Sequence, residues 1–332
     1  MIMSDGPELY ERNISDNINN IFLSKSVKFF LVLFIIYLIY YIINNKNNIK
    51  VCLCVIGKKE NLYAAEYVQH YKKLGYKHIF IYDNNDINDE RFEDVLNNEI
   101  LNNFVTIINY RGYRGINNHP QFDSYIDCYR NNNKKYDWLS FFDFDEFLYI
   151  SNNKTINLFL NDKIFNECIN IKINWLMYSD NDLMYYENKP IQERFTKFLL
   201  HDPGNNIIKS TIRGNLKTNY WDNMENPHTS NNDYISCNSL GIKISSRAYG
   251  NIPPTFKNAF IKHYATKSIE EYCKKIKRGR ADLKRTLNKK TIREVIKYFF
   301  TRNKFTEKKL NYFKKMFNYT YDFKFKKKYN KD

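Results

Sequence analysis

The stretch Trp138-Leu139-Ser140-Phe141-Phe142-Asp143-Phe144-Asp145-Glu146 passes from apolar to acidic at a single residue. Its first five residues have the pattern of a strand buried in a sheet, and two aspartates separated by one residue follow at once. Carboxylate oxygens are the ligands that hard divalent cations prefer. The stretch therefore predicts a buried strand that ends in a metal site held by Asp143 and Asp145. The alternative is a solvated acidic turn that caps a helix.

Strands and helices are expected to alternate along the chain before this stretch. The expected elements are, in order, a strand at 51–56, a helix at 62–74, a strand at 78–82, a helix at 89–96, a strand at 104–110 and a helix at 121–130. Such alternation indicates an α/β fold with a mainly parallel sheet flanked by helices. Ligands bind at the carboxyl ends of the strands in such sheets. We therefore expect the polar loops 58–61, 83–86 and 143–146 to converge on one crevice.

The second half of the chain is less regular. We expect a strand at 169–176, a loop at 201–206 and an irregular polar stretch at 215–234. Beyond residue 268 the chain becomes helical and basic. Residues 251–332 hold 25 Lys and Arg against 7 Asp and Glu, and the net charge of the whole chain is +16, so the rest is close to neutral.

The basic residues gather in a helical tail predicted at 285–332. Such a tail could contact anionic lipid, nucleic acid or an acidic partner, or it could be a solvated helical surface. Six aromatic residues interleave with its Lys and Arg side chains, as they would in a stacking surface. At helical spacing we expect them in a core instead. They are Tyr298, Phe299, Phe300, Phe305, Tyr312 and Phe313.

An uninterrupted apolar run, FFLVLFIIYLIYYII, occupies residues 29–43. Extended to residue 27, it would form a helix of about 26 Å at ~1.5 Å per residue, which is at the short end for a hydrocarbon core of ~30 Å. We predict a membrane anchor at 27–43 between a polar segment, 1–26, and a linker, 44–50. A buried core helix is the alternative. The run starts too far from Met1 for a signal peptide, and basic residues on both sides leave the orientation open.

The six cysteines lie at positions 52, 54, 128, 168, 237 and 273 and form no CxxC pair, which argues against a zinc knuckle. Cys52 and Cys54 share one face of the first predicted strand, and we expect both to be buried small hydrophobic side chains. A disulfide elsewhere would be compatible with an oxidising compartment.

Motifs spread over residues 51–280 occur in a particular order. They are Lys59-Glu60-Asn61, Glu66-Tyr67-Val68, His70, Leu74-Gly75, Ile81-Tyr82-Asp83-Asn84, Gln121, Tyr125, Cys128, Trp138-Leu139, Asp143-Phe144-Asp145-Glu146-Phe147-Leu148, Lys209-Ser210-Thr211-Ile212-Arg213, His228, and the block His263-Tyr264-Ala265-Thr266-Lys267-Ser268-Ile269-Glu270-Glu271 with Lys275 and Arg278-Gly279. Taken together, they resemble glycosyltransferase family 92 and the related family 2-like enzymes of GT-A fold.

The resemblance implies a GT-A domain over residues 51–284 and a hexosyltransferase-like enzyme. It implies transfer of a sugar, with inversion, from a nucleotide sugar that is often UDP-linked to a glycan or protein-linked acceptor. It also implies a divalent cation, Mn²⁺ or alternatively Mg²⁺. We expect an endomembrane location of Golgi or ER type and no specific nucleic-acid partner.

The resemblance also suggests roles for individual residues. Glu60 would lie at the first nucleotide-binding loop, and Asp83 with Asn84 would contact the base or ribose. Asp143 would approach the ribose and the metal, and Asp145 would bind the metal directly. Two histidines, His228 and His263, could complete the coordination or touch the diphosphate, although a lone histidine is as often structural. Three basic residues are candidate diphosphate partners: Lys209, Arg213 and Lys267.

An inverting transfer needs a general base beside the acceptor hydroxyl, usually a carboxylate. Asp180 and Asp182 follow the strand predicted at 169–176, where the family more often has Gly-rich sequence. Glu225 is a third candidate. All three could equally be exposed loop acids.

Two other functions fit parts of the sequence. A metal-dependent nucleotidyltransferase would use the same pair of carboxylates, and it would release pyrophosphate instead of a nucleoside diphosphate. A membrane-tethered protein could bind polyanions through the basic tail. The chain has no P-loop (GxxxxGK[ST]), which argues against the large class of P-loop nucleotide hydrolases.

Overall fold

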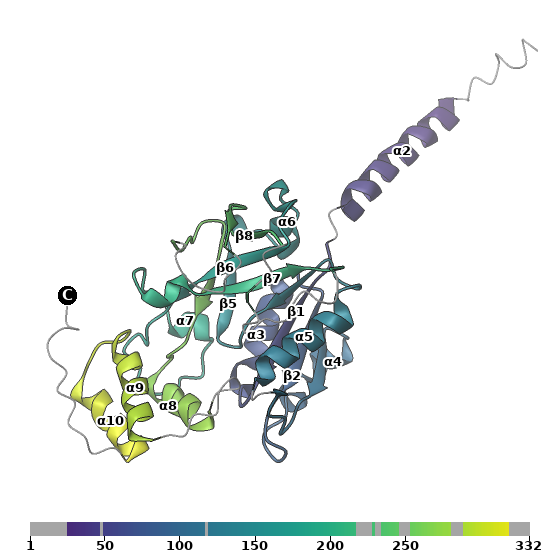
Figure 1. Ribbon diagram of the computed structural model, residues 1–332. Coiled ribbons are helices and arrows are strands. Elements are labelled where there is room, and N and C mark those ends of the chain that lie inside the picture. The colour runs from purple at the N-terminus through teal and green to yellow at the C-terminus, as the bar shows by residue number, and fades with distance from the viewer. Residues whose placement is uncertain are drawn as a thin grey trace, which may run out of the picture. The chain divides into compact units, whose positions relative to one another are not determined.

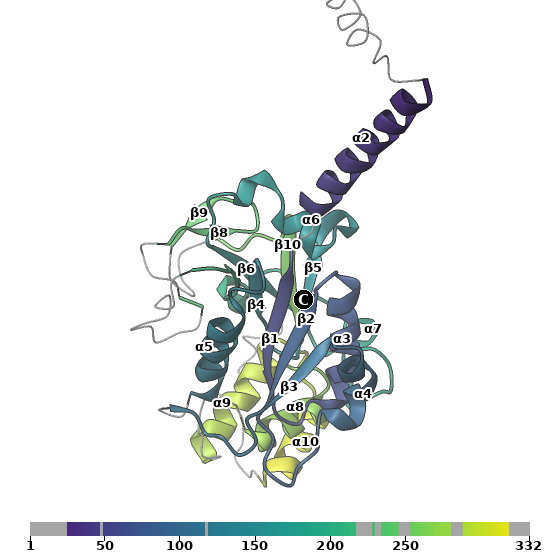
Figure 2. The same ribbon diagram turned by 90° about the vertical axis from the view of Figure 1, so that its right-hand side faces the viewer.

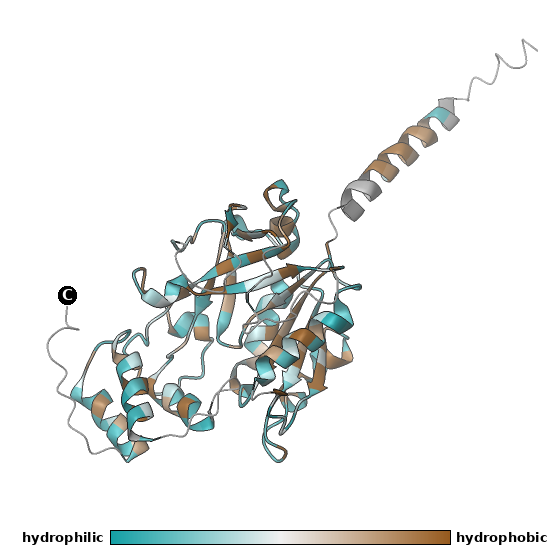
Figure 3. Cartoon of the chain, viewed as in Figure 1, coloured by the Kyte–Doolittle hydropathy of each residue, from teal (hydrophilic) through white to brown (hydrophobic). Residues whose placement is uncertain are grey.

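The computed structural model describes residues 25–46, 49–116, 119–216, 228–229, 234–245, 253–279 and 288–318. The chain forms two compact units, residues 1–48 and 49–332. In the first unit, helix α2 (Lys25–Lys46) contains the apolar run, and its described side chains, those of residues 28–39, are exposed. Figure 3 shows the apolar character of this helix. Among the residues whose placement is described, no helix meets the length and hydropathy needed to cross a membrane.

The second unit is built on a mixed β-sheet. Its described strands are β1 (Val51–Gly57), β2 (His78–Asp83), β3 (Val105–Asn109), β4 (Trp138–Phe141), β5 (Glu146–Ile150), β6 (Asn170–Met177), β7 (Ile208–Arg213), β8 (Ser236–Asn238), β9 (Lys243–Ile244) and β10 (Ala259–His263). They follow the order β3-β2-β1-β4-β7-β6-β10-β5, and β8 pairs with both β6 and β9.

The sheet is parallel over only half of its width. Strands β3, β2, β1 and β4 run parallel, as expected. Strand β7 then runs antiparallel to both β4 and β6, and β5 runs antiparallel to β10. The prediction of a mainly parallel sheet is therefore confirmed for the first half, whereas the second half is mixed, because β6 runs parallel to β10 and β8 but antiparallel to β7. Strand β5 follows β4 after a turn of a few residues, but it pairs with β10 at the other end of the strand order and not with β4.

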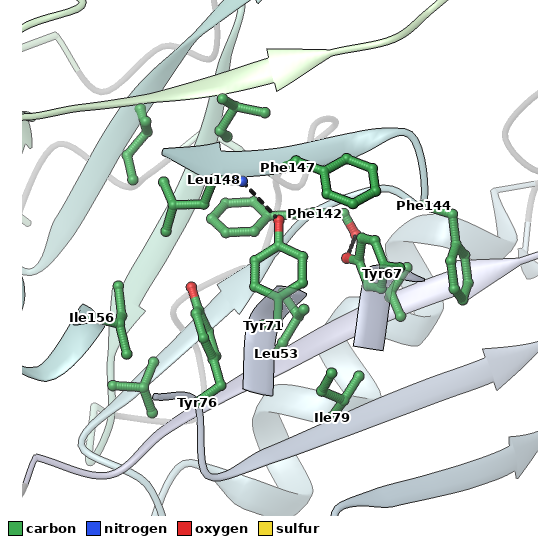
Figure 4. Packing of buried hydrophobic residues seen from close by; sticks show 14 of the residues in the cluster. Leu53, Tyr67, Tyr71, Tyr76, Ile79, Phe142, Phe144, Phe147, Leu148 and Ile156 are labelled. Atoms are coloured by element: carbon green, nitrogen blue, oxygen red, sulfur yellow. Dashed lines mark hydrogen bonds between the residues drawn. The ribbon is translucent and has the colours of Figure 1, made fainter. Parts of the chain in front are cut away.

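Helices cover both faces of the parallel half (Figure 2). On one face, α3 (Asn61–Lys73) and α4 (Glu93–Leu101) pack on the side chains of alternate β1 residues, Val51, Leu53 and Val55. On the other, α5 (Pro120–Asn132) packs on Cys52, Cys54 and Ile56. Side chains of a strand alternate between faces, so an all-apolar β1 requires a cover on each. Figure 4 shows the first of these cores, in which Tyr67 and Tyr71 of α3 meet Phe142 and Phe147.

Helix α4 begins four residues later than the sequence predicts. The guanidinium group of Arg111 donates hydrogen bonds to the carbonyl oxygens of four residues in the loop that precedes the helix, at 2.7–3.1 Å. Those four residues are Asp86, Ile87, Asp89 and Glu90. Their carbonyl groups point at one side chain, so this segment wraps around Arg111 instead of forming a helical turn. The predicted loop at 201–206 is partly a 3₁₀ helix, η4 (Pro203–Asn206).

Short elements complete the domain before its C-terminal part. Between β5 and β6 lie η2 (Ser151–Asn153), α6 (Ile156–Leu160) and η3 (Lys163–Phe165), and α7 (Ile191–Arg194) lies between β6 and β7. Two disulfides, Cys54–Cys128 and Cys168–Cys237, join β1 to α5 and the start of β6 to β8. Cys52 is a buried free thiol as expected, whereas the expectation for Cys54 is wrong because it faces Cys128.

The predicted tail belongs to the same compact unit as the sheet. Helices α8 (Ile269–Arg278), α9 (Lys289–Phe300) and α10 (Glu307–Phe317) lie together (Figure 1) and share one apolar cluster. Phe299, Phe300 and Phe313 are buried in it, so these aromatic residues are core residues, as their spacing predicts. Tyr298 is exposed and faces elsewhere.

Candidate active site

The acidic stretch forms a tight turn between β4 and β5. The backbone N–H of Glu146 donates to the carbonyl oxygen of Asp143 at 3.0 Å, and the Glu146 carboxylate accepts from the backbone N–H of Asp143 at 2.9 Å. Phe144, between the two aspartates, is buried and stacks on Phe92 with ring centroids 5.2 Å apart. This anchored ring leaves the two neighbouring carboxylates facing the cavity.

The Phe144 ring requires a glycine at the end of β1. A Cβ atom on Gly57 would lie 2.5 Å from Phe144 and 2.6 Å from Phe92, closer than side-chain contacts allow. Only glycine therefore permits these two rings to pack against the backbone of β1. The position of the acidic turn depends on this contact.

Asp143 is held by three donors. Its Oδ1 accepts from Gln121 at 2.7 Å and from Tyr125 at 3.2 Å, and its Oδ2 pairs with Lys209 at 2.7 Å. Burial alone would lower the pKa of Lys209, but the carboxylates of Asp143 and Glu146 outweigh it and raise that pKa. Lys209 is therefore a fixed positive charge beside the acidic turn.

Asp145 lies deeper and faces the C-terminal part of the domain. Its Oδ2 pairs with the ammonium group of Lys275 on α8, and its Oδ1 lies 3.7 Å from Nε2 of His263 on β10. Burial would raise the pKa of Asp145, but Lys275, His263 and Lys267 outweigh it, so the pKa lies far below its usual value. Burial also lowers the pKa of His263 to about 3, so its imidazole is neutral at pH 7.

Asp145, Glu146 and His263 are arranged as metal ligands. One ligand atom from each can be chosen so that all three lie within 4.8 Å of one another, and all three residues are buried. Nδ1 of His263 has no hydrogen-bond partner in the described structure, and Oε1 of Glu146 has only an ion pair with Lys209 at 3.4 Å. Burial raises the pKa of Glu146 well above its usual value. Carboxylate and neutral imidazole suit Mn²⁺ or Mg²⁺, and a cation would give the buried Nδ1 of His263 a partner, so these residues fit a metal.

A cavity of about 510 Å³ opens over this cluster. Its lining includes Lys58 and Glu60 from the first predicted loop, Asp143 and Asp145 from the third, and His263. The second loop touches the first, because Lys58 pairs with Asp86 at 2.9 Å and the backbone N–H of Lys59 donates to Asn85 at 2.7 Å. The first and third loops therefore meet at the cavity as expected, whereas the second loop contacts the first without lining the cavity.

The cavity also has a basic side. Arg278 on α8 pairs with Glu60 and donates to the carbonyl oxygen of Lys59 at 2.8 Å. Together with Lys275, it places two cationic side chains on the cavity wall. Lys267, a predicted diphosphate partner, is buried and does not line the cavity. Its ammonium lies 3.9 Å from the ring centroid of Tyr63, and burial lowers its pKa.

Two predicted nucleotide contacts, Asp83 and Asn84, are occupied by contacts with other residues of the chain. Asp83 pairs with Arg111 at 2.7 Å and accepts two hydrogen bonds from Asn85, and it is 2% exposed. Asn84 donates to the carbonyl oxygens of Tyr110 and Tyr113. Neither residue lines the cavity, and in this structure they shape the neighbouring loop.

Arg213 lies at the far end of β7 from the acidic turn. In the β4–β7 register it stands opposite Trp138, whereas Ser210 stands opposite Phe141. Its guanidinium group lies 4.4 Å from the Trp138 ring centroid and donates to the carbonyl oxygens of Cys168 and Phe165. The structure does not bring this predicted diphosphate partner to the cavity.

The predicted bases lie elsewhere as well. Asp180 and Asp182 both pair with Lys309 of α10, at 2.7 and 3.1 Å, and neither lines the cavity. Glu225 lies outside the described residues.

His228 is buried, and burial lowers its pKa. Its ring lies 5.9 Å from that of Tyr125, which in turn donates a hydrogen bond to Asp143.

Several cavity residues have no role in the sequence-based prediction. Lys275 and Arg278 occur in the motifs quoted above, as do Gln121 and Tyr125, so the signal for them was present. Glu294 and Tyr298 on α9 carry no such signal, because only the packing of α9 brings them to the cavity.

The fold and the site together define an α/β enzyme with an acidic centre at the carboxyl ends of its parallel strands. The sequence matches the model of Glycosyltransferase family 92 over residues 47–331. The chain therefore belongs to Glycosyltransferase family 92 and is a glycosyltransferase.

Comparisons with individual proteins give less information about this chain than the family match does. No curated protein matches the sequence. TarS of S. aureus is similar in structure with a TM-score of 0.33 and 10% identity, covering 76% of this chain and 43% of that one. GlyE of Streptococcus pneumoniae TIGR4 has a TM-score of 0.25 and 15% identity, covering 52% of this chain and 36% of that one. This chain thus spans less than half the length of either, and similarity at this level carries no argument here.

Proposed function

We propose that this glycosyltransferase transfers a sugar from a UDP-linked donor to a glycan or protein-linked acceptor, with inversion, and that it needs Mn²⁺ or Mg²⁺. One observation carries the metal dependence: Asp145, Glu146 and His263 bring carboxylate and neutral imidazole ligands within 4.8 Å of one another in a buried cluster. Asp143 lies beside them with one-third of its side chain exposed, open to a ribose or diphosphate.

The acidic and the basic residues of the site would have different roles. Asp145, Glu146 and His263 would hold the cation, with Asp143 beside it. A bound cation would neutralise charge on the leaving diphosphate. Lys275 and Arg278 line the same cavity and would contact phosphate oxygens. Glu60, which Arg278 already holds, would lie against the nucleotide.

The experiment compares Asp145→Asn with the wild-type chain in detergent. We expect wild type to release UDP from at least one UDP-hexose only when Mn²⁺ or Mg²⁺ is present. We expect Asp145→Asn to lower that rate at least 100-fold, because the buried carboxylate is both a ligand and the partner of Lys275. Asp94→Asn, at an exposed residue on α4, is the matched control and should leave the rate unchanged. UDP release that requires neither the metal nor Asp145 would refute the proposal.

The same assay separates sugar transfer from nucleotidyl transfer. Membership of family 92 favours sugar transfer, which leaves a nucleoside diphosphate. A nucleotidyltransferase would release pyrophosphate instead, and chromatography of the products distinguishes the two.

We further propose that residues 27–43 anchor the enzyme in an endomembrane of Golgi or ER type. The apolar character of α2 supports this. Two disulfides in the catalytic unit support an oxidising compartment for that unit. Binding of the basic tail to an anionic surface stays a prediction, and vesicle flotation with and without anionic lipid would test it.

A further inference from the structure

Helix α9 turns one face to the cavity and the other to the core. Thr291, Glu294, Val295 and Tyr298 line the cavity at the spacing of successive helical turns. Ile292, Ile296 and Phe299 are buried in the cluster shared with α8 and α10. Because this packing determines how the helix is rotated, the cavity face of α9 is a built part of the site.

Glu294 differs from the other cavity carboxylates. Glu60, Asp143 and Asp145 are paired with Arg278, Lys209 and Lys275. Glu294 has no ion pair or hydrogen bond with any described residue, although it lines the same cavity. The three paired carboxylates lie at the donor and metal side, and their charge is already countered. Glu294 is therefore the cavity carboxylate left to accept a proton.

The surroundings of Glu294 suit a sugar hydroxyl. Aromatic and aliphatic side chains of Trp175, Ile207 and Tyr298 line the cavity with it. Tyr298 is held in place because the guanidinium group of Arg302 lies 3.9 Å from its ring centroid, and Arg302 pairs with Asp202 at 2.8 Å. A fixed aromatic ring with a carboxylate one turn away can pack against the C–H face of a sugar and accept from its hydroxyl.

We propose that α9 forms the acceptor side of the site and that Glu294 is the general base. This inference rests on the proposed sugar transfer. The acceptor hydroxyl oxygen forms a bond to the anomeric carbon of the donor sugar as the bond from that carbon to the diphosphate oxygen breaks. The hydroxyl proton passes to the Glu294 carboxylate, and the electron pair leaves with the diphosphate. Attack opposite the leaving group gives inversion.

The test measures UDP release with water as the acceptor, using the UDP-hexose that wild type hydrolyses fastest. Glu294→Gln should lower kcat at least 100-fold, within the range that a general base contributes. The Kd of UDP in the presence of Mn²⁺ should change less than twofold. Glu294→Asp should recover part of kcat. Glu307→Gln, an exposed glutamate at the start of α10, is the matched control.

Each outcome decides between the two proposals. Wild-type kcat in Glu294→Gln would overturn the role of Glu294 and leave the proposed function standing. Loss of UDP binding in Glu294→Gln would also overturn it, because a base on the acceptor side does not contact the nucleotide. A wild-type enzyme that neither binds UDP nor releases it from any UDP-hexose would refute the proposed function itself.

Discussion

At the scale of single residues, two aspartates only two positions apart have different surroundings. Asp143 is one-third exposed and accepts from three neutral or cationic donors on α5 and β7. Asp145 is 7% exposed on its side chain and pairs with Lys275, 130 residues later in the chain. Because Phe144 is buried between them, both carboxylates face the cavity, but each reaches a different wall. This difference supports the proposed roles, in which Asp143 would face the nucleotide and Asp145 the metal.

A second residue-scale feature is the neutral histidine beneath β5. His70 on α3 is partly buried, and its Nε2 lies 2.9 Å from the carbonyl oxygen of Leu148. Burial lowers its pKa to about 4, from an ordinary value of about 6.5. The unfolded chain therefore binds a proton between pH 6.5 and 4 that the folded chain excludes, so stability falls as the pH is lowered through this range.

We expect His70→Gln to remove this part of the pH dependence. Urea unfolding at pH 7 and pH 5 should show wild type losing about 2 kcal/mol more than the variant. His201→Gln, at an exposed residue, should behave like wild type. An equal loss in wild type and His70→Gln would contradict the assignment.

At the scale of elements, α8 is the helix that carries cationic residues into the site, and its N-terminus is held from three sides. Ser268 and Glu271 form a capping box. Glu271 also accepts two hydrogen bonds from Arg194 at the end of α7, at 2.8 and 3.0 Å, and one from Tyr63 of α3 at 2.7 Å. The side chains of Arg194 and Glu271 are each 1% exposed. This buried pair joins α3, α7 and α8 and so positions Lys275 and Arg278.

Breaking the pair should cost far more than removing a surface charge. Arg194→Leu leaves the Glu271 carboxylate buried without its cation, and we expect it to lower the free energy of unfolding by about 3–5 kcal/mol. Adding Glu271→Gln should recover part of the loss, because the uncompensated charge is gone. Lys243→Leu, which breaks the exposed pair with Glu167, should change little. Chemical denaturation of wild type and the three variants would check this, and a loss in Arg194→Leu no larger than in Lys243→Leu would show that the pair is unimportant.

At the scale of the whole molecule, the catalytic unit includes its basic C-terminal helices. The apolar cluster of α8, α9 and α10 contains Ile269, Tyr272 and Cys273 from α8, all of them buried. Asp180 at the end of β6 and Lys309 of α10 form an ion pair in which each side chain is 2% exposed. Removing α9 and α10 would therefore expose the apolar face of α8 and unpair a buried aspartate.

We expect deletion of residues 285–332 to lower the melting temperature and abolish UDP release.

Phe299→Ala should destabilise the full chain by about 3–5 kcal/mol, as large truncations in a core do. Arg293→Ala, on the exposed face of the same helix, is its control. A truncated chain that melts like wild type and stays active would show that the tail is an accessory after all.

The sequence by itself determined the parallel half of the sheet and the acidic turn. Continuous apolar runs and apolar residues at helical spacing are local patterns, so β1, α3, β2 and α5 could be located within one or two residues. The pair Asp143 and Asp145 was recognisable because an apolar strand runs directly into it. The convergence of the loops followed from the geometry of parallel strands.

Only the tertiary structure decided which other side chains reach this turn. The register of β7 against β4 brings Lys209 to Asp143 and takes Arg213 to the opposite end of the strands. Asp180 and Asp182 lie in a plausible loop but pair with Lys309, and Glu294 reaches the cavity from the segment predicted as a tail. These placements depend on contacts between residues far apart in the chain. Strand register depends on which buried faces meet, and helix docking depends on the packing of whole surfaces, so both require residues from distant segments together.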